Sequence, residues 1–276
     1  MIALSSGSLY TYGLDRVFNL ASDIGFDGLE LMVDQRWDTR QADYLRQLMN
    51  QYQLPILAVH SPFVAYVPGW PRGEPARIKQ TTQLAEGVGA RIVVAHLPRR
   101  LGMYTLQRNS GGGRRLSIPV PWSSHAGYRR WLMNDLVEFQ ASTGVTIAIE
   151  NMPAWRILGQ RVNTCHWNDI QSLEQFSHLT LDTTHLGTWG IDPVATYDVW
   201  GERVAHVHLS NFNGAEHRLL DDGHLRLDRL LEHLASAAYD GVVTLEFNPG
   251  ALQAESERQV RGNLGESLAF CRDHFG

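Results

Sequence analysis

Lysine and net positive charge are scarce in this chain of 276 residues. Lys79 is the only lysine, and the formal net charge at pH 7 is −5. A surface that binds nucleic acid normally carries a basic bias, because its side chains must match the phosphate charge. The acidic balance therefore argues against a nucleic acid partner, although it is compatible with a local basic patch.

Cysteine and long hydrophobic runs are scarce as well. Cys165 and Cys271 have no CxxC spacing, so they give no disulfide framework and suit a reducing compartment. No apolar run approaches the ~18 residues of a membrane span, and the first residues lack a basic segment followed by an apolar one. We therefore expect a cytoplasmic protein with no membrane partner. The sequence leaves open whether copies of the chain form a homo-oligomer.

Eight short runs of strand-forming residues occur along the chain. Most are almost continuously apolar, which is expected of strands that are covered on both faces. The runs are Ile2–Ser5, Gly28–Met32, Ile56–His60, Ile92–His96, Thr146–Glu150, Leu179–Asp182, Val204–His208 and Val242–Glu246. Stretches with the amphipathic period of helices lie between them. These are Asp15–Ile24, Gln41–Gln51, Pro75–Val88, Tyr128–Thr143, Asn168–Phe176, Asp228–Ala237 and Ser256–His274.

The alternation of strands and helices predicts one α/β domain, a (β/α)8 TIM barrel over residues 1–276. An open doubly wound sheet is the alternative, but it usually has a glycine-rich first turn, and Ser6-Gly-Ser-Leu9 does not match GxGxxG. We accordingly predict no organic cofactor. An irregular insertion with five arginines is expected at about residues 98–122. A loop of this length is often a functional lid, and a solvated surface loop is the other interpretation.

Residue types that ligate metals stand at the last position of six successive predicted strands. They are His60, His96, Glu150, Asp182, His208 and Glu246. In a barrel these positions meet at the carboxyl-terminal mouth, where active sites of this fold lie. A single histidine at a strand end is usually only a hydrogen-bonding residue, but chance rarely places six such residues together. Imidazole and carboxylate ligands suit a borderline divalent ion such as Zn²⁺, Mn²⁺ or Co²⁺, so we predict a catalytic metal site.

Two residues stand apart from this pattern. Glu30 lies inside the second predicted strand. His206 alternates with His208 on one strand, and we expect it to face away from the barrel interior.

Several segments carry a resemblance to a known family. VTIAIENMP, LTLDTTHLG, AHVHLSNFNG and GVVTLEFNP, with FDGLELM and AVHSPF nearer the start, resemble signature segments of the xylose-isomerase-like TIM-barrel superfamily. This superfamily contains the sugar phosphate isomerase/epimerase and AP endonuclease family 2 group. The resemblance runs through the whole chain, but its motifs do not specify the substrate.

The resemblance implies a site and an activity. In the ketose 3-epimerases of this group one divalent ion is held by four residues, which match Glu150, Asp182, His208 and Glu246. The resemblance further implies that the two glutamates are catalytic, as acid and base on opposite faces of a sugar. The ion, Mn²⁺, Co²⁺, Zn²⁺ or Mg²⁺, would stabilise the enediolate formed when a carboxylate removes a proton beside the carbonyl. The expected activity is isomerisation or epimerisation of a sugar or sugar-like hydroxycarbonyl compound.

Further residues are expected to bind this substrate. They are His60, His96, His185, Arg156 and His217. His185, on the loop expected after Asp182, resembles a histidine that hydrogen-bonds substrate oxygen. Ketose epimerases have an acidic residue near the position of Arg156 and an arginine near that of Gly214, so substrate binding differs here. Arg156, or an arginine of the insertion, is a candidate for binding a carboxylate or phosphate.

Endonuclease IV, another branch of the superfamily, gives the alternative hypothesis. It holds three zinc ions with nine ligands, and eight positions have matches here. These are His60, His96, Glu150, Asp182, His185, His208, His217 and Glu246. Ala215 occupies the ninth position, and its neighbour Glu216 is expected to point elsewhere. A zinc-dependent phosphodiesterase or AP endonuclease is thus the second hypothesis, and the acidic balance of the chain argues against it.

Overall fold

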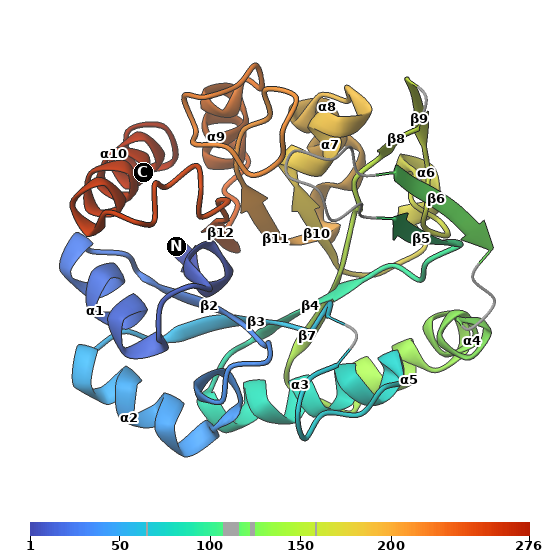
Figure 1. The fold of residues 1–276 in the computed structure, drawn as a ribbon, viewed down its shortest axis with the longest axis horizontal. Helices are drawn as coiled ribbons and strands as arrows, with labels where there is room; N and C mark the ends of the chain where they lie inside the picture. Colours follow the sequence, from blue (N-terminus) through green and yellow to red (C-terminus); the bar gives the residue numbers. More distant parts are fainter. Residues whose placement is uncertain (65, 107–115, 122–124, 158) are drawn as a thin grey trace.

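The computed structural model describes residues 1–64, 66–106, 116–121, 125–157 and 159–276. Eight parallel strands close into a barrel in the order β1-β12-β11-β10-β7-β4-β3-β2 (Figure 1). They are β1 (Ile2–Ser5), β2 (Gly28–Met32), β3 (Ile56–His60), β4 (Ile92–His96), β7 (Thr146–Glu150), β10 (Leu179–Asp182), β11 (Val204–Leu209) and β12 (Val242–Leu245). The predicted α/β barrel is confirmed, and every predicted run is a strand. The last one ends a residue early, so Glu246 lies just beyond β12.

Helices surround the barrel (Figure 1). They are α1 (Leu14–Ile24), α2 (Ala42–Tyr52), α3 (Glu74–Val88), α4 (Ala126–Asn134), α5 (Leu136–Ala141), α6 (Ile170–Leu173), α7 (Thr183–Trp189), α8 (Pro193–Trp200), α9 (Leu227–Ser236) and α10 (Glu257–Phe275), with 3-10 turns η1 (Ser6–Leu9), η2 (Asp38–Arg40) and η3 (Gly201–Arg203). The helix predicted over residues 128–143 is two helices that meet at Asp135, and α7 and α8 are additional to the prediction. Within the described ranges no helix is long and apolar enough to cross a membrane.

The strand register places two pairs of predicted site residues side by side. His96 pairs with Glu150, and Asp182 pairs with His208, on adjacent strands. Deeper in the barrel a small apolar cluster is made by Ala3, Ala58, Ile92, Val94, Ala148 and Val242. A much larger one includes the alternate strand residues and the inner faces of the helices. Burial of apolar surface contributes about 25 cal/mol per Å² to the free energy of folding, so these clusters stabilise the barrel. The polar residues at the mouth of the barrel are therefore not needed for the core and are available for binding or catalysis.

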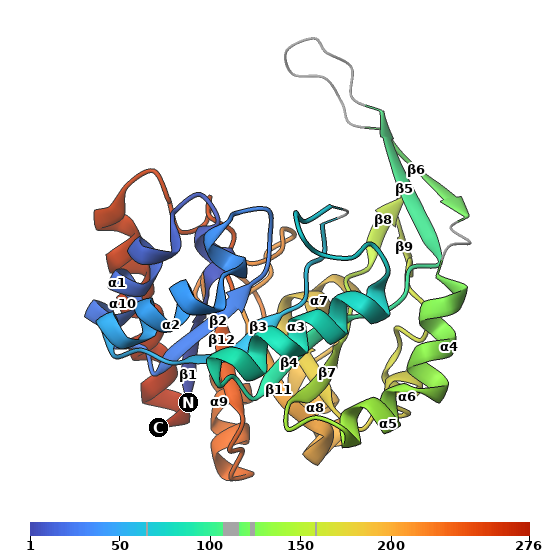
Figure 2. The same cartoon turned by 90° about the horizontal axis from the view of Figure 1, so that it is seen from below.

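The insertion at residues 98–122 is more regular than predicted. β5 (Leu101–Leu106) and β6 (Leu116–Pro121) pair as a two-stranded antiparallel sheet, which rises away from the barrel in Figure 2. A second antiparallel pair, β8 (Trp155–Ile157) and β9 (Gln160–Val162), stands beside it. Arg108, Arg114 and Arg115 lie outside the described residues. Arg99 and Arg100 are described, and Arg99 is bridged to Cys165 just before β5 begins.

Candidate metal centre

Four predicted ligands meet at the barrel mouth around one imidazole. The Nδ1 atom of His208 lies 2.9 Å from Glu150 Oε1, 3.1 Å from Glu246 Oε2 and 3.7 Å from Asp182 Oδ2. One ligand atom from each residue lies within 4.8 Å of the others. Glu150, Asp182 and His208 are buried, whereas the Glu246 side chain is 14% exposed. The set expected from the sequence is therefore close enough together to hold one ion.

Asp182 divides its two oxygens between the fold and the site. Oδ1 accepts a hydrogen bond of 2.8 Å from the backbone N–H of His185, which caps the start of α7. Oδ2 is buried and has no hydrogen-bond partner. The carboxylate is thus fixed in orientation by the helix and presents a free oxygen to the cluster.

The donor set fits a divalent cation. Three carboxylates lie within 4 Å of one nitrogen, and Asp182 Oδ2 is buried without a hydrogen bond. Burying anionic oxygens without a partner is costly, and a bound cation is the usual remedy. Imidazole and carboxylate ligands together suit Mn²⁺, Co²⁺ or Zn²⁺. His208 Nδ1 and the three carboxylates are the groups that would hold the ion.

The ionisation of these groups shows how the chain balances the charge. Burial alone would raise the pKa of the Glu150 carboxyl, but the charge of His208 and hydrogen bonds from surrounding histidines outweigh it and hold this pKa well below its usual range. Burial would lower the pKa of His208, yet the charges of Glu30, Glu246 and Glu150 raise it well above the ordinary value. Without a bound ion, the protonated ring of His208 therefore supplies the positive charge among these carboxylates. A divalent ion would replace its Nδ1 proton.

His60 and His96 approach Glu150 from the other side. The Nε2 atom of His96 lies 2.9 Å from Glu150 Oε2, and that of His60 lies 3.6 Å from it. His60 Nδ1 lies 2.8 Å from the carbonyl oxygen of Ser61. A carbonyl can only accept, so Nδ1 carries a proton and Nε2 is the atom presented to the site. The three residues form a second cluster whose ligand atoms lie within 4.8 Å of one another.

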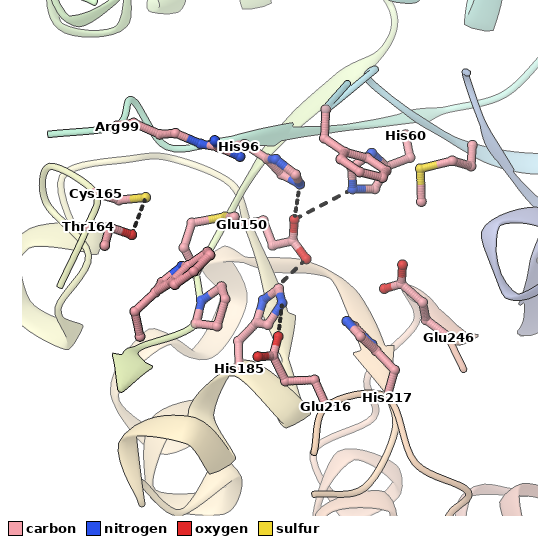
Figure 3. Close-up of a pocket in the computed structure, with 15 residues that line it drawn as sticks. His60, His96, Arg99, Glu150, Thr164, Cys165, His185, Glu216, His217 and Glu246 are labelled. Atoms are coloured by element: carbon pink, nitrogen blue, oxygen red, sulfur yellow. Dashed lines mark hydrogen bonds and ion pairs between the residues drawn. The ribbon is translucent and has the colours of Figure 1, made fainter. Parts of the chain in front are cut away.

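His185 and His217 lie on the opposite side of the pocket from His60 and His96 (Figure 3). His185 is in α7 and not on a loop, and its Nδ1 donates to the carbonyl of Asn151 over 2.8 Å, which leaves Nε2 toward the pocket. The prediction that Glu216 points elsewhere is wrong. Its Oε2 lies 3.9 Å from His185 Nε2, and it lines the same pocket. Alternation applies to strands, but Glu216 is in an irregular segment in which His217 has a φ of 55°.

Among the residues that the structure describes, one arginine lines the pocket, Arg99, which belongs to the insertion expected as the alternative to Arg156. The pocket has a volume of about 280 Å³. It is lined by the four histidines that the sequence predicted to bind substrate, by Glu150 and by Glu246. Trp155 also lines it, but Arg156, the next residue on β8, is exposed and does not. Neighbouring residues of a strand point to opposite sides, which explains the difference. Arg99, at the start of the insertion, lines the pocket instead.

The prediction that His206 faces away from the barrel interior is also wrong. Residues two apart on a strand point to the same face, so His206 and His208 both point inward. His206 Nε2 lies 2.6 Å and His208 Nε2 lies 2.9 Å from Glu30 Oε2. All three residues are fully buried. The sequence carried this signal, because Glu30 is a charged residue in an otherwise apolar strand.

Comparisons with known proteins agree with this architecture. A family model described as Xylose isomerase-like TIM barrel matches residues 18–274. An uncharacterized protein of Mycobacterium leprae (strain TN) is 26% identical over an aligned length of 297 residues, gaps included. The alignment covers 99% of this chain and 97% of that protein.

Solved structures add two neighbours. One described as a D-tagatose 3-epimerase-like protein has a TM-score of 0.67 at 20% identity and covers 100% of this chain and 99% of its own. The other, described as AP endonuclease, family 2 from Brucella melitensis, has a TM-score of 0.64 at 16% identity. The match covers 90% of this chain and 93% of that structure's chain. At these identities the likeness shows the fold alone, and the two neighbours carry the names of both branches considered above.

Proposed function

The chain belongs to the xylose isomerase-like TIM barrel family, and from that premise we propose that it is a divalent-metal-dependent isomerase or epimerase of a sugar or sugar-like hydroxycarbonyl compound. One observation carries the proposal. Two carboxylates that line the pocket, Glu150 and Glu246, both lie within 3.1 Å of His208 Nδ1. A pair of carboxylates beside a metal site is what proton transfer next to a carbonyl requires.

The two glutamates differ in ways that suggest separate roles. Glu150 is enclosed by His60, His96 and His208, whereas Glu246 is more exposed and has contact only with His208 among them. Figure 3 shows the side chains of both residues among those that line the pocket, with Glu150 close to His60 and His96. We assign Glu246 as the base that takes the proton beside the carbonyl. Glu150 is ionised in the resting site, so it first takes a proton from the His60 imidazolium, whose Nε2 atom lies 3.6 Å from its Oε2 atom, and then gives that proton to the other face of the substrate.

A divalent ion at the four-residue cluster would supply a Lewis acid that polarises the substrate carbonyl. The histidines bind and orient the substrate. His60 and His185 each donate Nδ1–H to a backbone carbonyl, which fixes the ring and aims Nε2 at the substrate oxygens. Arg99 takes the role expected of Arg156 and binds any anionic group of the substrate.

Glu246→Gln tests the proposal directly. We expect it to reduce turnover by roughly 10²–10⁴-fold, because the amide cannot accept the proton, and to leave the dissociation constant of a ketose nearly unchanged. Turnover of a panel of ketoses and equilibrium binding of a ketose are both measured at saturating Mn²⁺. A loss of metal affinity in the variant then does not affect either measurement. Glu216→Gln is the matched control, since Glu216 lines the same pocket outside the four-residue cluster. Retained turnover in Glu246→Gln would show that the base is misassigned.

A zinc-dependent phosphodiesterase of the endonuclease IV type is the second candidate. Two observations favour it. The ligand atoms of Asp182, His185 and His217 form a further cluster within 4.8 Å of one another, and Glu216 reaches His185. These residues could hold additional ions that activate water in place of the carboxylate base. This candidate predicts cleavage of duplex DNA at an abasic site, which the first candidate does not.

A further inference from the structure

A buried carboxylate lies behind the metal centre, on the side away from the pocket. Glu30 is on β2 and is fully buried, and it does not line the pocket. Its contacts cross the barrel interior to β11, which is separated from β2 in the barrel by β1 and β12. It therefore cannot touch a substrate, although it touches a residue of the cluster.

The contacts of Glu30 are directed at the ring nitrogens of two histidines. Its Oε2 atom lies 2.9 Å from His208 Nε2 and 2.6 Å from His206 Nε2. Its Oε1 atom accepts a longer bond, 3.4 Å, from the Ser5 hydroxyl. Both contacts have hydrogen-bond lengths, and a carboxylate oxygen accepts from each ring. The three ligand atoms also lie within 4.8 Å of one another, but all three residues are fully buried and none lines the pocket, so we describe the group as a hydrogen-bonded network.

Burying the Glu30 carboxylate costs free energy, so its presence needs an explanation. A charged carboxylate inside a barrel is expensive, and an apolar side chain would normally fill such a position. An imidazole ring has two nitrogens, and a hydrogen bond to one determines which is left for a ligand. Here Nε2 of His208 faces Glu30, and Nδ1 faces the three carboxylates of the cluster.

We propose that Glu30 is the positioning residue of the metal centre: it accepts the Nε2–H of His208, fixes the ring, and keeps Nδ1 as the ligand atom. This inference rests on the proposed function, because it needs an ion at the four-residue cluster. Glu30 also places one more negative charge close to that ion, which strengthens its binding. His206 is the second donor that holds the Glu30 carboxylate in place.

Metal affinity, measured without any turnover assay, tests the inference. Glu30→Gln keeps the size of the side chain but loses its charge, and we expect it to weaken Mn²⁺ and Zn²⁺ binding by roughly 10–100-fold. His206→Gln is the comparison variant: it keeps the bond between Glu30 and His208 and removes one donor that holds the Glu30 carboxylate, so we expect a smaller loss of metal affinity than in Glu30→Gln. Isothermal titration of metal into each metal-free protein gives the dissociation constants. Circular dichroism confirms that each variant is folded.

A second measurement is insensitive to overall stability. In the Zn²⁺-loaded protein, long-range ¹H–¹⁵N NMR identifies the protonated nitrogen of His208, which we expect to be Nε2. Equal metal affinity in wild type and Glu30→Gln overturns the inference, as does an equal loss in both variants or an unprotonated Nε2. Those results leave the proposed function standing. A wild-type chain that binds no divalent ion overturns both, so the two failures are distinguishable.

Discussion

At the scale of single residues, the side chains of the site divide their atoms between support and chemistry. Asp182 caps α7 with Oδ1 and presents Oδ2 to the cluster. His60 and His185 bond backbone carbonyls through Nδ1 and present Nε2 to the pocket. His208 does the reverse, with Nε2 toward Glu30 and Nδ1 toward the carboxylates. Each of these three rings is thus oriented by a partner that does not line the pocket, which is how a site is preorganised.

The pH dependence of stability follows from the raised pKa of His208. A group whose folded pKa lies above its unfolded value of about 6.5 stabilises the protein fully below that pH and loses this contribution as the pH rises through the folded pKa. The pKa values of His96 and His206 are lowered, so these groups titrate below this window. We expect the melting temperature of metal-free protein to fall as the pH rises above about 6.5. Thermal melts after chelation check this.

The metal-loaded protein is the control for that titration. An ion takes the place of the Nδ1 proton of His208, so saturating Mn²⁺ should flatten the pH dependence and stabilise the protein most at the alkaline end. A melting temperature of the metal-free protein that rises over this window contradicts the assignment.

The residues that sequence reasoning placed correctly are those at strand ends. Their position follows from the fold, because parallel strands of a barrel end at one mouth. Glu216 could not be placed, and Arg99 could be expected only as one of the arginines of the insertion, because each lies in an irregular segment whose backbone path is set by tertiary contacts. His206 could have been placed, since the period of two that governs strands puts it beside His208.

At the scale of elements, α7 links the site to the outer layer. It begins directly after β10, and the Thr183 hydroxyl in its first turn donates to the carbonyl of His208 on β11 and to that of Ser210 just beyond β11. Thr183, Thr184 and Gly187 are weak helix formers, which is why the sequence did not predict a helix there. The Asp182 cap and packing against the barrel stabilise it instead.

Gly187→Ala tests the packing of α7. An added Cβ would lie 2.8 Å from Phe212 Cβ, so the helix or the ring must shift. We expect the free energy of unfolding to fall by about 1–3 kcal/mol, as overpacking typically costs, and metal binding to weaken because Asp182 and His185 move with the helix. Urea titration and metal titration measure the two effects.

Gly262→Ala in α10 is the control for that substitution. Nothing lies within 4 Å of its added Cβ, and the site is exposed, so alanine should stabilise the helix by roughly 0.5–1 kcal/mol. Equal stability of Gly187→Ala and wild type would mean that α7 tolerates displacement and does not position the site.

At the scale of the whole molecule, the barrel could be predicted because eight strand runs alternate with seven helical stretches along most of the chain. The break at Asp135 and the antiparallel pair β5 and β6 could not, because they depend on local geometry that composition does not record. The candidate metal ligands could likewise be predicted, because they stand at strand ends at the mouth of the barrel. The identity of the substrate could not, because it depends on the insertions around the mouth. Both candidate functions share the four-residue cluster and differ in what the metal-loaded site does.

One paired assay decides between them most directly. The same metal-loaded preparation is incubated with a panel of ketoses in D₂O and, separately, with duplex DNA containing an abasic site. Proton transfer by Glu246 and Glu150 predicts deuterium at a carbon beside the carbonyl of at least one ketose, loss of that exchange in Glu246→Gln, and intact DNA. Cleavage of the DNA without deuterium in any ketose would contradict the central claim that this site transfers protons on a sugar.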